Sequence, residues 1–355
     1  MKKILILLDK RKYLSTSLRN KEKMVDYNII RKNLEKKGVE VEIKSLHELI
    51  FPTKYDKWYV IFPSSEDAGL FYKEYIEDIL LRLQLDGAIL LPRFEMFRAH
   101  HNKVFMESYR TLLSQEYNTI HSFSFYGIDD LKRKLNSEII YPVILKTSSG
   151  AGSSGVAIAN NKVETIAKAR KMSKITFYGC YFTRKRGIKS IIRRTIRFMT
   201  GQLGLEAPRI QEKMICQSFV ANLSCDYKVL VFGEKYYLLR RKTKKNDFRA
   251  SGSGLLEFPN EFTETEKEIL NYSRVAYKQL NTPLLSIDIA FDGNTCHMIE
   301  FQTLNFGPYT LQFSNCYYKY KSSGDWSRIF EESILEEEMA NAYIYYINKE
   351  NKNEK

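Results

Sequence analysis

The sequence is poor in the residues that mark metal-binding and disulfide-rich proteins. It has five cysteines and five histidines in 355 residues, and none of the cysteines forms a CxxC pair or another metal-ligand spacing. An odd number of scattered cysteines argues against a disulfide framework and fits a reducing compartment, so we expect a cytoplasmic protein. No apolar run reaches the length of a membrane-spanning helix. The apolar start, Ile4–Leu8, is too short for a signal peptide, and we expect it to be a β-strand.

Two common nucleotide-binding motifs are also missing. No GxGxxG follows the first expected strand, and no GxxxxGK[ST] occurs, which argues against a dinucleotide fold and a Walker loop. No zinc-finger or RNP-like signature is present either. The net charge of +14 favours anionic partners, but a nucleic-acid partner rests on this charge alone.

What is present is typical of a folded globular protein, with 44% hydrophobic and 13% aromatic residues. Alternating strand and helix patterns before residue 98 predict a small open α/β sheet. The expected strands are 3–8, 39–43, 58–62 and 88–91, with helices at 27–37 and 69–85. Later helices are expected at 98–113, 128–136, 264–280 and 326–348, and residues 309–324 are expected to be irregular.

The stretch Leu284–Pro308 predicts a hairpin with acidic side chains inside largely apolar strands. Asp292-Gly293-Asn294 has the composition of a tight turn. The hairpin can bring Asp288 and Glu300 to one face beside the amide of Gln302. Three such oxygen ligands suit Mg²⁺, which favours carboxylates together with phosphate oxygens. An ordinary hairpin with two surface acids is the other interpretation.

A Gly/Ser-rich loop follows a predicted strand that ends in Lys146. Three glycines allow a close approach of the backbone and expose its N–H groups to an anion, and four serines add hydroxyl donors. The residues are Gly150, Gly152 and Gly155, with Ser148, Ser149, Ser153 and Ser154. Together with the Lys146 point charge they favour phosphate binding over a merely flexible loop.

Residues 183–205 form a basic stretch without acids, and Arg184–Met199 has apolar residues at helical spacing. This pattern predicts a basic amphipathic helix. Such a helix can lie on an anionic membrane, which would make the protein peripheral to its inner face. Alternatively, its apolar face packs on the protein and its charges meet solvent or substrate.

The order of these motifs resembles the ATP-grasp ligase superfamily. The agreement runs from about Arg98 to Pro308: Asn-Lys, strand–Lys–Gly/Ser loop, Gln-Ser-Phe-Val, Asp-Tyr-Lys-Val, Asp-Phe-Arg-Ala-Ser-Gly and Asp…Glu-x-Gln. Within the superfamily the sequence is most similar to bacterial proteins associated with capsule and cell-envelope polysaccharide synthesis. The resemblance implies an α/β ATP-grasp fold with four parts. These are a pre-ATP-grasp α/β domain (1–98), a lid lobe carrying the Gly/Ser loop and the basic insert (99–220), a catalytic and metal lobe (221–324), and a terminal helix and tail (325–355).

The resemblance also implies roles for individual residues. Lys103 and Lys146 would contact the nucleotide phosphates, and the Ser148–Gly155 loop would fold over them as a lid. The adenine would meet Gln217, Phe219 and Val220, and the ribose would meet Asp226. Lys228 is also expected among the nucleotide-binding residues. Arg240 and Arg249 would face the γ-phosphate and the acyl phosphate formed from it. Asp288, Glu300 and Gln302 would hold Mg²⁺. The family usually has Glu-x-Asn there, so Gln302 is a departure with a longer arm, and Asn305 is a second candidate amide.

The activity implied is an ATP- and Mg²⁺-dependent carboxylate–amine ligase acting on an envelope- or polysaccharide-related carboxylate and amine. A phosphotransferase on the same fold is a remoter alternative. A third hypothesis is a nucleotide-binding protein that has lost ligase activity and docks to membrane or nucleic acid. Gln302 and the net charge of +14 motivate it.

Overall fold

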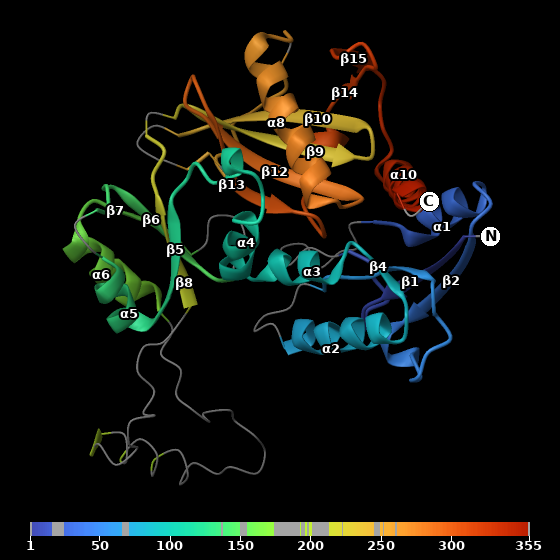
Figure 1. Cartoon of the computed structure of the whole chain (residues 1–355), viewed down its shortest axis with the longest axis horizontal. Helices are drawn as coiled ribbons and strands as arrows, with labels where there is room; N and C mark the ends of the chain where they lie inside the picture. Colours follow the sequence, from blue (N-terminus) through green and yellow to red (C-terminus); the bar gives the residue numbers. More distant parts are fainter. Residues whose placement is uncertain are drawn as a thin grey trace. The chain divides into compact units, whose positions relative to one another are not determined.

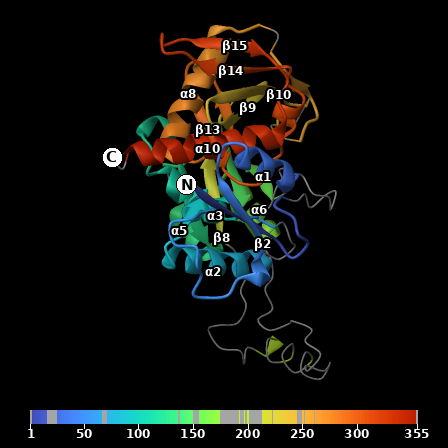
Figure 2. The same ribbon diagram turned by 90° about the vertical axis from the view of Figure 1, so that its right-hand side faces the viewer.

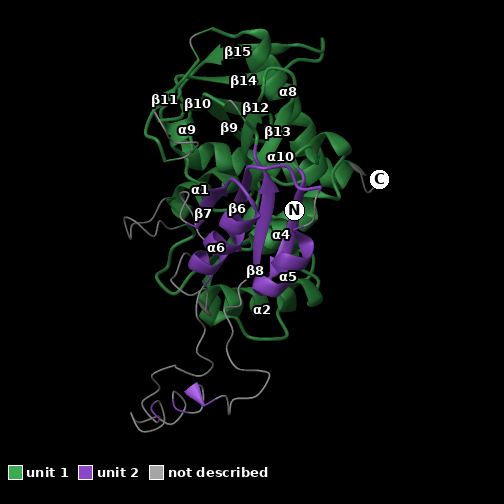
Figure 3. Cartoon of the chain, turned by 90° about the vertical axis from the view of Figure 1, so that its left-hand side faces the viewer, with its two compact units in different colours: residues 1–120, 220–355 green, residues 121–219 purple. Residues whose placement is uncertain are grey.

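The fold is taken from a computed structural model of the chain. The structure describes residues 2–15, 25–65, 71–135, 138–149, 155–173, 192, 196, 199–200, 213–221, 223–244, 249–250, 252–259 and 261–353. These residues form two compact units, shown in different colours in Figure 3. Unit 1 comprises residues 1–120 and 220–355, and unit 2 comprises residues 121–219.

Unit 1 begins with the predicted open sheet. Its strands are β1 (Lys3–Leu8), β2 (Glu40–Ser45), β3 (Tyr59–Ile61) and β4 (Ile89–Leu91), all parallel, in the order β2-β1-β3-β4. Helices α1 (Tyr27–Glu35) and α2 (Phe71–Leu85) connect them. Strand β1 is buried from Ile4 to Leu8, as expected for a parallel strand covered on both faces. This confirms the α/β pattern expected before residue 98.

Unit 1 also contains a larger antiparallel sheet. Its order is β13-β12-β9-β10-β14-β15, with β11 also pairing with β10. The strands are β9 (Cys225–Phe232), β10 (Lys235–Lys242), β11 (Leu256–Glu257), β12 (Leu284–Phe291), β13 (Cys296–Gln302), β14 (Cys316–Tyr320) and β15 (Trp326–Phe330). The predicted hairpin is therefore β12 and β13, at one edge of this sheet.

The two faces of the central strands pack against different partners. On one face, Val229, Leu238 and Ile287 form a core with α8 (Glu264–Leu280). On the other face, Leu230 and Phe232 pack with residues of β1, α1 and α10 (Leu335–Asn353). Helix α10 lies beside α1 in both Figure 1 and Figure 2, and their side chains share this second core. On this second face, β9 is apolar near the turn that leads into β10, and the opposite end of β9 carries charged side chains.

Helix α8 begins and ends at the residues that the sequence indicated. Thr263 and Glu266 form a capping box at its start, and Asn281 ends it in a left-handed conformation with φ of 43°. The hydrophobic stripe of α8 then packs on the central sheet. This helix supports the strands that hold the charged row described below.

Three expectations about secondary structure are wrong. The single helix at 98–113 is instead α3 (Phe94–His101) and α4 (Lys103–Arg110), because Asn102 has a non-helical backbone and caps α4 by accepting a hydrogen bond from the Phe105 N–H. The helix at 326–348 starts at Leu335, because residues 326–330 pair with β14 as β15. Residues 309–324 contain α9 (Tyr309–Gln312) and β14 instead of being irregular.

Unit 2 is a four-stranded antiparallel sheet in the order β5-β8-β6-β7. The strands are β5 (Ser122–Tyr126), β6 (Val143–Thr147), β7 (Val156–Ala159) and β8 (Lys213–Ser218). Helices α5 (Gly127–Lys134) and α6 (Lys162–Met172) cover one face and form its core with Leu145, Met214 and Cys216. None of the helices that the structure describes is long and apolar enough to span a membrane.

Candidate active site

A row of charged side chains crosses four strands of the large sheet in unit 1. Arg241 of β10 lies opposite Asp226 of β9, Lys228 of β9 lies opposite Asp288 of β12, and Asp288 lies opposite Glu300 of β13. Side chains alternate between faces along a strand, so Asp226 and Lys228 point the same way. All five side chains therefore share one face, beyond the apolar end of β9.

Arg241 joins the two aspartates of the row. Its Nε lies 2.6 Å from Asp226 Oδ1, and its Nη2 lies 2.8 Å from Asp226 Oδ2 and 2.9 Å from Asp288 Oδ2. Lys228 Nζ donates to the other oxygen of Asp288, Oδ1, at 3.0 Å. The Arg241 side chain is only 3% exposed. The planar guanidinium presents several donors in a fixed fork, which suits an arginine to this shared position.

The environment separates the pKa values of the two aspartates. Burial raises the pKa of Asp288, but the positive charges of Arg241 and Lys228 outweigh burial and lower it to about 2. Burial prevails at Asp226 and raises its pKa to about 6, although Arg241 opposes the shift. At neutral pH both carboxylates are ionised and face cations.

Glu300 ends the row beside Lys103 and Gln302. Lys103 Nζ lies 3.3 Å from Glu300 Oε1, and Gln302 Nε2 donates to the same oxygen at 3.3 Å. Lys103 is the first residue of α4, and its position follows from the cap formed by Asn102. The predicted residues Lys103, Lys228, Asp288, Glu300 and Gln302 are thus brought together.

The whole row is electrically neutral, because Lys103, Lys228 and Arg241 face Asp226, Asp288 and Glu300. A bare anion would have to displace carboxylates from their cations. A ligand that brings both signs, such as a phosphate chain with a divalent metal, can exchange these ion pairs for new ones. Phosphates would take the cations, and the metal would take the carboxylates.

The donor chemistry at this end of the row fits Mg²⁺. Asp288 and Glu300 supply carboxylate oxygens from neighbouring strands, and a half-turn of the Gln302 amide would present its oxygen beside them. Both Asp288 oxygens already meet cations, so this is not a preformed all-protein cage. Within the described part of the chain, no group of three or more His, Cys, Asp or Glu side chains is arranged to hold a metal. Mg²⁺ often binds through one or two carboxylates plus substrate phosphates, which this set allows.

Three other predicted residues of unit 1 lie elsewhere or at the edge of the described part. Arg240 points to the opposite face from Arg241 and pairs with Glu257 of β11, with Nε 3.0 Å from Oε2. Asn305 accepts a hydrogen bond from Ser15, with a left-handed φ of 49°. Arg249 is exposed and follows residues 245–248, which lie outside the described residues. The roles predicted for these three residues remain predictions.

In unit 2, Lys146 and Gln217 share the face of the sheet that α5 and α6 do not cover. Lys146 pairs with Ile215, and Ile144 pairs with Gln217, so these four side chains alternate with the core residues of the same strands. Lys146 and Gln217 are both buried. Phe219 and Val220 continue the chain directly after β8.

The described ends of the Gly/Ser loop are held by hydrogen bonds. Thr147 N–H donates to Gly155 O at 2.9 Å, and Thr147 Oγ1 donates to Ser149 O at 2.7 Å. Gly155 has φ of +76°, and a Cβ there would lie 2.2 Å from Thr147 Oγ1. Ser148 is buried. Gly150, Gly152, Ser153 and Ser154 lie outside the described residues, as does nearly all of the basic stretch at 183–205.

Comparison with known proteins reveals similarity to solved structures, but no similarity to family models or curated sequences. No family model matches the sequence, and no curated protein matches it. Among solved structures, D-alanine–D-alanine ligase from Bacillus anthracis is similar over 100% of both chains, with 15% identity and a TM-score of 0.54. A RimK domain protein from Sphaerobacter thermophilus is similar over 96% of this chain and 99% of its own, with 10% identity and a TM-score of 0.50.

The chain has the ATP-grasp fold. A third similar structure is an ATP-grasp ligase associated with ribosomal peptides in Chryseobacterium gregarium, in complex with ADP and a leader and core peptide. It covers 96% of each chain with 12% identity and a TM-score of 0.50. At these identities the likeness establishes the ATP-grasp fold and not the reaction. The predicted fold class is confirmed.

Sequence reasoning missed Arg241, although the signal was present. Arg240 and Arg241 are adjacent, and only one of two neighbouring strand residues can share a face with Asp226. The register of the β9–β10 hairpin, counted back from its turn at Gly233-Glu234, pairs Arg241 with Asp226. Counting register from the turn would have selected Arg241 for this face.

Proposed function

We propose that the protein is an ATP- and Mg²⁺-dependent ligase that joins a carboxylate to an amine through an acyl phosphate. The observation that carries the proposal is the neutral row from Arg241 to Glu300 on one face of a sheet in a chain with the ATP-grasp fold. The cations that would bind the nucleotide phosphates are Lys103, Lys228 and Arg241. Glu300, Asp288 and Gln302 are the oxygen donors offered to Mg²⁺, which when bound neutralises phosphate charge.

Catalysis of this reaction requires mainly that the reactants are positioned and that the phosphate charge is neutralised. A carboxylate is a poor electrophile, and transfer of the γ-phosphoryl group to it gives an acyl phosphate and ADP. An amine then attacks the acyl carbon, the C–O bond to phosphate breaks, and an amide and inorganic phosphate result. Little covalent help from the protein is needed, in keeping with a site built from Lys, Arg and carboxylates. Lys146, Gln217 and Phe219 of unit 2, the Ser148–Gly155 loop, and Val220 at the start of the second segment of unit 1 are proposed as further nucleotide contacts.

The substrates are the finer part of the proposal. A carbon–nitrogen bond follows from the resemblance to carboxylate–amine ligases, and an envelope- or polysaccharide-related substrate rests on the sequence resemblance alone. The docking-protein alternative keeps nucleotide binding and loses turnover. ADP formation stimulated by an amino acid or amino sugar separates the two hypotheses.

Thermal unfolding with a non-hydrolysable ATP analogue and Mg²⁺, together and separately, tests the site. A ligand at about one hundred times its dissociation constant stabilises a protein by about 2.7 kcal/mol, which gives a visible shift in Tm. We expect the large shift only with both ligands, and we expect Glu300→Gln to abolish it. Glu257→Gln is the matched control, because Glu257 faces Arg240 away from the row. Equal shifts in the two variants, or no shift in wild type, would overturn the proposal.

A further inference from the structure

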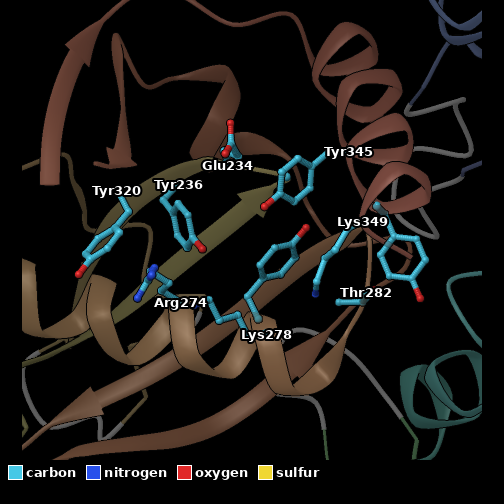
Figure 4. A pocket seen from close by; sticks show the side chains of 11 residues that line it. Glu234, Tyr236, Arg274, Lys278, Thr282, Tyr320, Tyr345 and Lys349 are labelled. Carbon is cyan, nitrogen blue, oxygen red and sulfur yellow. The ribbon is translucent and has the colours of Figure 1, made fainter. Parts of the chain in front are cut away.

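A second candidate binding site lies in unit 1 at the turn between β9 and β10. It is a pocket of about 270 Å³ whose lining comes from this turn, from α8, from the end of β14 and from α10 (Figure 4). Its volume lies just below the usual range for small-molecule sites, which favours a ligand with one ring over a longer chain.

The pocket and the charged row lie at opposite ends of the same hairpin. Tyr236 of the pocket is near the turn, where Lys235 pairs with Phe232, whereas Arg241 is near the open end, where Lys242 pairs with Cys225. Five residues separate Tyr236 from Arg241, or about 17 Å along a strand at about 3.4 Å per residue. The pocket is therefore separate from the proposed phosphate and metal site.

Tyrosine rings form much of the pocket wall. Tyr236, Tyr320 and Tyr345 come from three different elements, and Figure 4 shows them around one opening. The Arg274 guanidinium lies 3.6 Å from the centre of the Tyr320 ring, which holds this arginine in the pocket. Arg274 covers that face of Tyr320 and Tyr236 is only 4% exposed, whereas Tyr345 is 38% exposed and offers open ring surface on which the flat apolar face of a sugar or base ring can pack.

Three cations line the same pocket without a carboxylate to neutralise them. Arg274 and Lys278 are one turn apart on α8, and Lys349 comes from α10. Across the residues that the structure describes, none of these three cations has a carboxylate oxygen within 4.0 Å. The acid in the lining, Glu234, instead pairs with Lys319 at 3.0 Å.

The cations are close enough to oppose one another. Partial desolvation of the Lys278 ammonium lowers its pKa, and the charges of Arg274 and Lys349 lower it further. Like charges that converge on one cavity repel one another, although Lys349 Nζ donates to Asn281 Oδ1 at 3.1 Å and Arg274 stacks on Tyr320. An anion in the pocket would relieve this repulsion and accept charge-assisted hydrogen bonds from Lys and Arg.

We propose that this pocket binds a phosphate monoester carried on a single ring, with the phosphate on Lys278, Arg274 and Lys349 and the ring against Tyr345. A phosphorylated monosaccharide and a mononucleotide share this chemistry. The proposal does not depend on the ligase activity, because it uses none of the residues assigned to that reaction.

Calorimetric titration of the full chain tests the site with known probes. Glucose 6-phosphate and adenosine monophosphate are compared with glucose, adenosine and inorganic phosphate. Each titration is run with a saturating non-hydrolysable ATP analogue and Mg²⁺, so that a nucleotide bound at the charged row is not counted. We expect at least one monoester to bind at least tenfold more tightly than its unphosphorylated form and than inorganic phosphate.

The decisive variant is Lys278→Gln, because Lys278 is exposed and its loss should leave the fold intact. It should weaken the monoester about tenfold. Lys267→Gln on the same helix is the control, since Lys267 pairs with Glu264 on the surface and lines no part of the pocket. Unchanged binding in Lys278→Gln, equal weakening in both variants, or no binding of either monoester would overturn the proposal. If inorganic phosphate bound as tightly as the monoesters, the proposed contact between the ring and the pocket would be wrong.

Discussion

Arg241 donates two hydrogen bonds to Asp226, at 2.6 and 2.8 Å, across the paired strands β10 and β9. The same guanidinium reaches Asp288 on the far side of β9. One arginine thus holds carboxylates that come from two different strands. Its neighbour Arg240, on the other face, pairs with Glu257, and the side chains of that pair are 37% and 33% exposed.

The two adjacent arginines should therefore differ sharply in their contribution to stability. Arg241→Met leaves the buried Asp226 without the cation that holds both its oxygens and leaves Asp288 with Lys228 alone, and breaking a buried pair in this way costs about 3–5 kcal/mol. Arg240→Met removes a pair whose side chains are 37% and 33% exposed, and such pairs contribute about 0–1 kcal/mol. Urea unfolding of both variants measures the difference. Similar losses in the two would show that the buried network does not stabilise the fold.

Lys146→Met should remove ATP turnover while leaving unit 2 folded. Methionine keeps most of the volume of the buried side chain and removes its charge, and loss of one group that stabilises the reacting phosphate typically costs 10²–10³-fold in rate. ADP formation in the presence of an amine and a carboxylate is the measurement. Lys168→Met in the same unit is the control, because Lys168 pairs with Glu164 on the surface of α6. Full turnover in Lys146→Met would remove this lysine from the site.

Gly155→Ala should destabilise the protein by about 2 kcal/mol, and Gly254→Ala by about 1 kcal/mol. Both glycines have positive φ, +76° and +77°, so both variants meet the backbone cost of a left-handed conformation. Only at Gly155 would the new Cβ also displace the Thr147 hydroxyl from Ser149 O. Chemical denaturation of the two variants tests this ranking, and the reverse order would contradict the role given to Thr147.

Stability should fall as the pH drops from about 6.5 to 4, in part because of His101. Burial, with the charges of Lys73 and His100, lowers the pKa of His101 to about 4. A lowered pKa means that the unfolded chain takes up the proton first, so the stabilisation is present above pH 6.5 and is lost on the way to pH 4. The slope for one proton is at most about 1.4 kcal/mol per pH unit.

The raised pKa of Asp226 acts in the opposite direction, since the folded chain takes up that proton first. The comparison of wild type with His101→Gln therefore isolates the histidine. The difference in unfolding free energy between the two should shrink steadily as the pH falls from 6.5 to 4. A difference that stays constant across this range would mean that His101 titrates normally.

Local patterns allowed much of the fold to be predicted. The strands β5 and β12–β13 and the helix α8 are encoded within a few residues by alternation, turn residues and a capping box, all of which act locally. The exceptions are instructive. Residues 326–330 were expected to begin a helix, but Trp326 packs on Tyr236 and Tyr320, and its segment pairs with β14. These residues are extended because they form hydrogen bonds with strand β14.

The sequence by itself, with its resemblance to the ATP-grasp superfamily, selected Lys103, Lys228, Asp288, Glu300 and Gln302 for the candidate site, but it did not select Arg241. Only the tertiary structure decided how they are paired and which arginine joins them. The physical reason is that the choice between Arg240 and Arg241 depends on strand register, and a shift of one residue moves every side chain to the other face. The pocket at Lys278 had no local signal at all, because its three cations come from helices about seventy residues apart and meet only when α8 and α10 have packed.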